Sequence, residues 1–208
     1  MRARLLLFTA LLLWCGALIA VRVGYSGRVT YVFLVWNLFL AVVPAVAAAL
    51  FVRARSTFAR ITSFVIWLAF LPNAPYIATD FIHLRPRPGI PLWFDIALLL
   101  SCAATGIFLA FTSLADVQGV VSERWGNGVA WSFSLAVLVL CGFGIYLGRF
   151  LRWNSWELIT EPVAKASYLT ASALHPLEHP RTFGVTAIYG ITLALGYAAF
   201  RVTRESSR

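Results

Sequence analysis

Six stretches of this chain run for 17 or more residues without a charged side chain, and they limit what it can fold into. At ~1.5 Å per residue, a helix of that length crosses, or nearly crosses, the ~30 Å hydrocarbon layer of a bilayer. Only helices and closed barrels satisfy every backbone polar group inside that layer. We therefore predict an all-α, polytopic membrane protein, a six-helix transmembrane bundle with one long interfacial helical connection.

The predicted spans leave no room for a separate soluble domain, so we expect a single transmembrane domain over residues 1–208. The spans are expected at about 5–23, 29–52, 59–79, 92–115, 127–148 and 183–200, with an interfacial segment at 153–175. The chain is 12% charged, against about 25% in soluble domains.

Arg2 and Arg4 precede the first apolar run as in a signal peptide. That run is long for a signal peptide and lacks a small-residue cleavage site, so we expect a retained helix.

The net charge of +9 is carried mostly by arginines at the ends of the predicted spans. Arginines there anchor helices at the headgroups, so we expect the lipid bilayer as a partner and no nucleic acid. The pattern names no cofactor and leaves the oligomeric state open.

Small residues recur four apart at Gly106 and Ala110, at Gly144 and Gly148, and at Gly190 and Ala194, a spacing typical of close helix packing.

The third predicted span begins as an ordinary apolar helix and ends in polar residues and helix breakers. Pro72 and Pro75 predict a kink or a short break after its apolar half. Polar side chains follow with a 3-4-3 spacing, which puts them on one face if this part is helical. They are Asn73, Tyr76, Asp80 and His83.

Two carboxylates and a histidine are candidates for catalysis. Asp80 and His83, three residues apart, suit a shared metal or an acid–base pair, or are simply hydrated near the headgroups. Asp95 opens the fourth span, where a carboxylate is favoured by the helix dipole. A sharper interpretation makes Asp95 a second carboxylate near Asp80.

Other polar residues gather toward the same membrane face. Arg149 and Arg152 end the fifth span, either as headgroup anchors or as a fork that binds phosphate or carboxylate. Asn154 and Glu157 have the spacing of a helix cap that begins the interfacial segment, and they are also candidates for polar support. Asn37 lies in the second span, where a lone amide needs an interhelical partner.

A zinc-protease pattern in the last connection is rejected. His175 and His179 match the spacing H-x-x-E-H, which requires a continuous helix to bring both histidines to one metal. Pro176 and Pro180 leave barely one turn between them. We therefore expect no metal site there.

Four blocks of sequence stand out as unusual for membrane helices. They are Asn37–Ala41 with Pro44, Trp67–Leu84, Trp93–Asp95 and Gly144–Glu157. Together they resemble the bacterial membrane proteins called domain of unknown function 1361. The likeness runs from about Tyr31 to Phe200 and leaves the first span outside. It implies a polytopic protein of the bacterial cytoplasmic membrane and supplies no activity.

The charge distribution weakly favours a cytoplasmic N-terminus, with nine basic residues inside and eight outside. In either orientation the polar residues share one face, where we expect a single site. Three functions are compatible with it. The favoured one is a scaffold or envelope-associated protein; the alternative is a membrane enzyme acting on an anionic lipid or lipid-linked headgroup; the second alternative is a transporter. No ionisable residue lies deep within a span, which disfavours the transporter.

Overall fold

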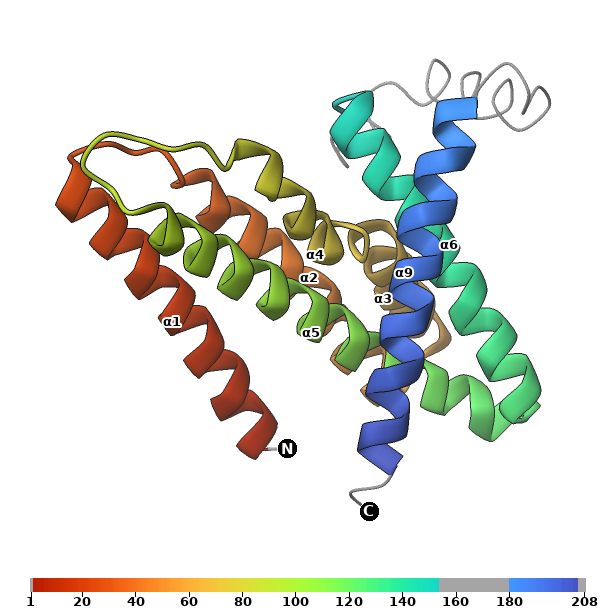
Figure 1. Cartoon of the computed structure of the whole chain (residues 1–208). Helices are drawn as coiled ribbons and strands as arrows, with labels where there is room; N and C mark the ends of the chain where they lie inside the picture. Colours follow the sequence, from red (N-terminus) through yellow and green to blue (C-terminus); the bar gives the residue numbers. More distant parts are fainter. Residues whose placement is uncertain (1, 154–179, 206–208) are drawn as a thin grey trace. The chain divides into compact units, whose positions relative to one another are not determined.

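The structure is a computed structural model that describes residues 2–153 and 180–205, and its elements are helices (Figure 1). In chain order they are α1 (Arg2–Ser26), α2 (Phe33–Arg53), α3 (Thr57–Phe70), α4 (Asn73–Tyr76), the 3-10 helix η1 (Ile77–His83), α5 (Leu92–Trp125), α6 (Asn127–Phe150) and α9 (Pro180–Glu205). All but the first residue of the predicted interfacial segment at 153–175 lie outside the described residues.

Six helical segments within the described residues are long and apolar enough to cross a membrane. They are α1, α2, the stretch Thr57–His83, α5, α6 and α9. Large apolar side chains such as Leu6 and Phe58 point outward, 70% and 81% exposed. A surface of this kind suits lipid as its solvent. The prediction of an all-α, six-helix, multi-pass membrane protein is confirmed.

The fourth span is longer than predicted. We expected it to end near residue 115, because Asp116 ends the uncharged run, but α5 continues to Trp125. A charged residue ends an apolar pattern without ending a helix. The helix stops at Gly126, whose φ of 84° lies in the left-handed region that favours glycine.

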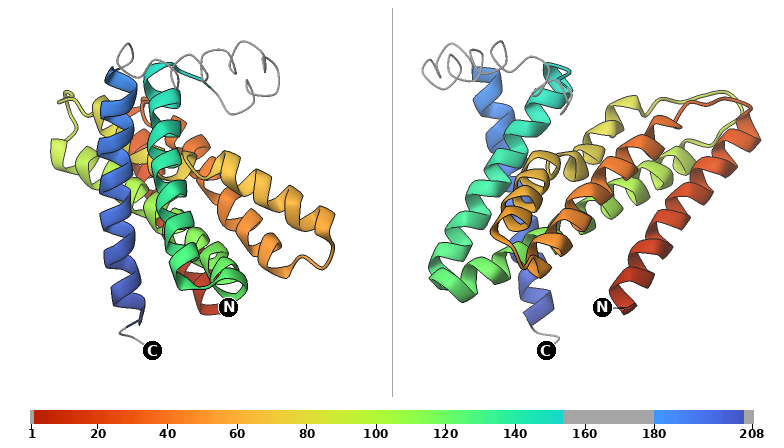
Figure 2. Two further views of the ribbon diagram at one scale, coloured as in Figure 1. Left: turned by 90° about the vertical axis from the view of Figure 1, so that its right-hand side faces the viewer. Right: turned by 180° about the vertical axis from the view of Figure 1, so that it is seen from behind.

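The chain divides into two compact units, residues 1–113 and 114–208, with the division inside α5. In the first unit, α2 and α3 form a hairpin, seen in the left view of Figure 2. Ser56 caps α3 by accepting a hydrogen bond from the Ala59 N–H at 3.2 Å. Trp67 is fully buried and donates its indole N–H to Ser113 Oγ at 3.3 Å.

The break in the third span brings the chain close to α5. The residues around Pro72 and Pro75 form a turn, the four-residue helix α4 and then η1. Gly106 of α5 faces this segment: a Cβ there would overlap the Ala74 carbonyl oxygen. The predicted break is therefore observed, and Gly106 packs closely, as its small-residue spacing predicted.

Helix α1 contacts α5 through side chains spaced seven residues apart, which lie on one helix face. Phe8 meets Phe108 with ring centroids 5.8 Å apart. Cys15 Sγ lies 3.4 Å from Thr105 Oγ1. Arg22 binds the carboxylate of Asp95. These contacts run down the two antiparallel helices and attach the first span to the unit.

In the second unit, α6 and α9 lie side by side, as the views in Figures 1 and 2 agree. At Gly142 the two backbones come close, because a Cβ there would lie 2.6 Å from the Thr186 carbonyl oxygen. The buried amide of Gln118 ties the end of α5 to α9: its Oε1 accepts from Tyr197 Oη at 2.6 Å and from Arg201.

Candidate functional site

Asp80 is the first of the predicted site residues, and it is buried against α2. It lies in the 3-10 helix η1, which follows the proline-containing segment. The residue is 1% exposed, and Asn37 Nδ2 donates to its Oδ2 at 2.8 Å. Asn37 therefore has the interhelical partner that a lone amide in a span requires.

The four polar residues expected on one face have different surroundings. Asn73 donates its amide to the Phe70 carbonyl at 3.1 Å, a local contact within the turn. Tyr76 is half-buried. His83 is exposed, and its ring packs edge-on against Phe33 with centroids 5.2 Å apart. In a 3-10 helix, residues three apart lie on the same side. Asp80 and His83 are three apart, yet Asp80 is buried and His83 is exposed.

Asp95 lies in the first turn of α5 and is paired with an arginine from α1. Arg22 Nε donates to Asp95 Oδ1 at 2.6 Å, and Arg22 Nη2 donates to Oδ2 at 3.3 Å. The two side chains are 1% and 2% exposed. This is a bidentate, charge-assisted pair, the strong form of an arginine–carboxylate contact.

Sequence reasoning missed Arg22 as a partner of Asp95. An arginine near the end of a span typically anchors the helix at the headgroups, and the sequence predicted this role for Arg22. A signal was present: Arg22 and Asp95 are oppositely charged and lie at span ends on the same membrane face. The sequence gives no direct sign of which spans are neighbours, so the pairing had to come from the structure.

Tyr31 lies beside the Arg22–Asp95 pair and is bonded to the end of η1. It is fully buried, and its hydroxyl donates to the His83 carbonyl at 3.3 Å. Burial, and then the negative charge of Asp95, raises the pKa of the Tyr31 phenol. The phenol therefore stays protonated at neutral pH and remains a donor.

The guanidinium groups of Arg149 and Arg152 belong to the second unit. Arg149 lies half-buried in the last turn of α6, and Arg152 is exposed just past its end, with a φ of 57°. The Trp153 N–H closes the end of the helix by donating to the Leu147 carbonyl at 3.1 Å. A shared site with Asp80, and the phosphate fork, stay predictions. Asn154 and Glu157 lie outside the described residues.

The carboxylates could also be considered as metal ligands. Among residues 2–153 and 180–205, no three His, Cys, Asp or Glu side chains gather in a group that could hold a metal ion. In this part of the chain Oδ2 of Asp80 accepts from Asn37, and both oxygens of Asp95 accept from Arg22. The arrangement therefore joins helices: α2 to η1, and α1 to α5.

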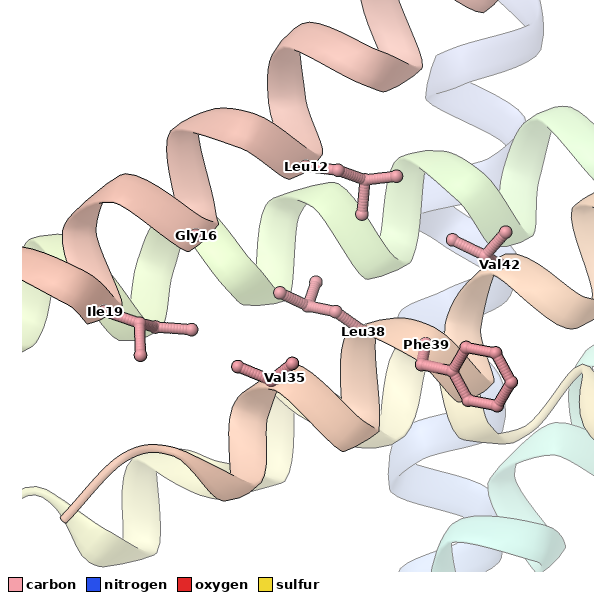
Figure 3. Close-up of a pocket in the computed structure, with 7 residues that line it drawn as sticks. All are labelled: Leu12, Gly16, Ile19, Val35, Leu38, Phe39 and Val42. Carbon is pink, nitrogen blue, oxygen red and sulfur yellow. The ribbon is translucent and has the colours of Figure 1, made fainter. Parts of the chain in front are cut away.

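A hollow of about 240 Å³ lies between α1 and α2 in the first unit (Figure 3). All the residues that line it are apolar: Leu12, Gly16, Ile19, Val35, Leu38, Phe39 and Val42. It offers dispersion contacts and no side chain that would orient a polar group. We assign it no part in the candidate site.

Six helical segments long and apolar enough to cross a membrane define a multi-pass integral membrane protein. The sequence profile of one family, described as "Protein of unknown function (DUF1361)", matches residues 36–195. The chain belongs to this family, as the resemblance of its four sequence blocks implied. No curated protein and no solved structure matches the chain. Arg22 lies outside the matched residues, whereas Asp80 and Asp95 lie inside them.

Proposed function

We propose that this protein is a scaffold or envelope-associated membrane protein whose buried polar residues hold its helices in one arrangement. One observation carries the proposal: Asp80 and Asp95, the two carboxylates best suited to catalysis by sequence, are each 1% exposed and bonded to a neighbouring helix. A catalytic acid or base must come within hydrogen-bonding reach of its substrate. Oδ2 of Asp80 accepts from Asn37, and both carboxylate oxygens of Asp95 accept from Arg22.

The contacts have the strength that a structural role needs. A buried carboxylate or amide that loses its partner keeps its full cost of desolvation. The Asp80–Asn37 contact and the Arg22–Asp95 pair therefore penalise any separation of α2 from η1, or of α1 from α5. A protein that presents a fixed surface to lipid or to other chains depends on such rigidity.

Two substitutions at one position separate a structural role for Asp80 from a catalytic one. Asp80→Asn keeps an oxygen that can accept from Asn37, so it should leave folding and cellular function close to wild type. Asp80→Leu removes the acceptor and should lower the free energy of unfolding by about 1–3 kcal/mol. The measurements are thermal unfolding in mild detergent and rescue of envelope integrity in cells that lack the gene.

In the scaffold proposal, the rescue by each variant follows the amount of folded protein. An Asp80→Asn protein that folds like wild type but fails to rescue the cells would contradict it. That result is the signature of a carboxylate that transfers a proton or binds a metal. Thr79→Ser is a matched control at the preceding position of the same 3-10 helix. It removes one methyl group and keeps both the Asp80 carboxylate and a hydroxyl that can donate to the Tyr76 carbonyl.

We further propose that the protein resides in a bacterial cytoplasmic membrane with its N-terminus in the cytoplasm. The support is the slight excess of basic residues on the N-terminal side. In this orientation the loop at 84–91 lies outside the cell and the loop at 54–56 lies inside, because the third span, Thr57–His83, separates them.

Cysteine labelling tests this orientation. The native cysteines at 15, 102 and 141 are buried, so an introduced exposed thiol should dominate the signal. Arg85→Cys is expected to react with a membrane-impermeant maleimide in intact cells, whereas Arg55→Cys should react only after permeabilisation. The reverse pattern would show a cytoplasmic polar face and overturn the proposed orientation.

A further inference from the structure

A polar hollow lies at the end of the first unit, between the loop that follows α1 and the loop that precedes α5. The two loops lie side by side at the upper left of Figure 1. The hollow measures about 170 Å³, several times the ~30 Å³ that one water occupies in the liquid. Three arginines line it, Arg22, Arg28 and Arg87. We call it the three-arginine pocket.

Tight turns fix the backbone on both sides of the three-arginine pocket. In the loop before α5, the Ile90 N–H donates to the Arg87 carbonyl at 3.3 Å. Pro88 and Gly89 lie between them, and the φ of 80° at Gly89 matches the third residue of a type II turn. Arg87 is therefore presented by a preorganised turn.

The loop after α1 is held in a comparable way. Gly27, with a φ of 63°, ends the helix by donating its N–H to the Val23 carbonyl at 2.8 Å. Ser26 Oγ donates to the Arg22 carbonyl at 2.7 Å and accepts from the Arg28 N–H at 3.1 Å. The backbones that carry Arg22 and Arg28 are thereby joined through one side chain.

The pocket gathers more positive than negative charge. The guanidinium of Arg22 lies 5.6 Å from the ring centroid of Tyr31, and that of Arg87 lies 5.3 Å from the same ring. Two cations thus share one aromatic side chain. Asp95 neutralises Arg22 only, so the group as a whole favours an anion.

One donor of this group lacks an acceptor among the residues that the structure describes. Arg22 is 1% exposed, and its Nε and Nη2 both donate to Asp95. Its Nη1 is buried, and no atom of the described residues accepts a hydrogen bond from it. A guanidinium is a planar fork whose remaining edge suits the oxygens of a phosphate. The pair with Asp95 fixes the orientation of that fork.

We propose that the three-arginine pocket binds a phosphate-bearing anion at the membrane surface. A phosphate offers several charged oxygens to three guanidinium groups, and each such contact is a charge-assisted hydrogen bond. The phosphate belongs either to a lipid headgroup or to a small soluble anion. This inference goes beyond the scaffold proposal, because holding the helices together requires neither Arg28 nor Arg87.

Native mass spectrometry of the full chain in mild detergent tests the pocket. The probes are phosphatidylglycerol, phosphatidylcholine with the same acyl chains, and inorganic phosphate. Arg28→Gln/Arg87→Gln removes two cations and leaves the Arg22–Asp95 pair in place. Arg55→Gln replaces an exposed arginine just past the other end of α2 and controls for the loss of one surface charge.

The double variant is expected to bind the anionic probe at least about tenfold more weakly than wild type, because it loses charged hydrogen-bond donors. Arg55→Gln should bind like wild type. Selective retention of phosphatidylglycerol over phosphatidylcholine identifies a lipid headgroup as the ligand. Binding of inorganic phosphate with the same dependence on the variants identifies a soluble anion.

The proposal would be overturned if the double variant bound phosphatidylglycerol and inorganic phosphate as tightly as wild type does. Thermal unfolding of each variant shows whether it is folded. If the double variant does not fold, the single variant Arg28→Gln tests the pocket instead, since that side chain is exposed. Its loss should still weaken binding of the anionic probe about tenfold. A stable wild-type protein that binds neither phosphatidylglycerol nor inorganic phosphate refutes the pocket and leaves the scaffold proposal standing.

Discussion

Replacing Arg22 with leucine is expected to lower the free energy of unfolding by about 3–5 kcal/mol, the cost of breaking a buried ion pair by removing one partner. The variant leaves the Asp95 carboxylate at 1% exposure without its bidentate donor. At roughly 2–4 °C per kcal/mol for a chain of this size, the loss corresponds to a fall in Tm of roughly 6–20 °C. Thermal unfolding in mild detergent measures it.

The double variant Arg22→Leu/Asp95→Leu is the decisive control. Replacing both members of a buried pair with apolar residues is often neutral or stabilising. It should therefore recover most of the stability that the single variant loses, so that the two changes are strongly non-additive. Arg55→Leu, at an exposed position between α2 and α3, should have little effect. A single variant as stable as wild type would show that the pair contributes nothing.

Replacing Gly142 with alanine is expected to destabilise the second unit by about 3 kcal/mol, at the upper end of the usual 1–3 kcal/mol for overpacking. The added Cβ would lie 2.6 Å from the Thr186 carbonyl oxygen and 2.8 Å from the Gly190 nitrogen. Both obstacles are backbone atoms, so a change of side-chain rotamer cannot relieve them. The α6 and α9 helices would have to move apart. Thermal unfolding measures the loss of stability, and the yield of a disulfide between cysteines introduced on α6 and α9 measures their separation.

A second glycine supplies a control, because its replacement with alanine is expected to raise the stability of the protein. Gly119 lies inside α5 in the same unit, and nothing lies within 4 Å of a Cβ placed there. Gly119→Ala should stabilise the protein by about 0.5–1 kcal/mol, because alanine loses less backbone freedom in a helix. If Gly142→Ala stabilised the protein as Gly119→Ala does, the close approach of α6 and α9 would be refuted.

The spans were predictable from sequence because lipid imposes a simple rule on composition and length. The break after Phe70 followed from Pro72 and Pro75, and the need of Asn37 for a partner followed from its depth. The end of α5 was missed because charge marks the edge of a membrane, whereas a glycine with positive φ marks the end of this helix.

The candidate site was predicted only in part, because composition does not say which helices are neighbours. Asp80 and Asp95 stood out in the sequence, but their partners depend on the packing of α1, α2 and α5. Gly142 was likewise missed: the four-residue spacing drew attention to Gly144 and Gly148, which lie on the same helix. Whether a residue faces a neighbour or lipid is a property of the assembled helices.

The Arg22–Asp95 pair has a consequence for how the protein is made. Its partners are 73 residues apart in sequence. At 5–20 residues per second, the ribosome needs roughly 4–15 s to add the carboxylate after the arginine. During that interval α2 and α3 are synthesised, and the cation of α1 has to rest among headgroups or water. The first helix therefore closes onto the fourth span only after Asp95 has been synthesised.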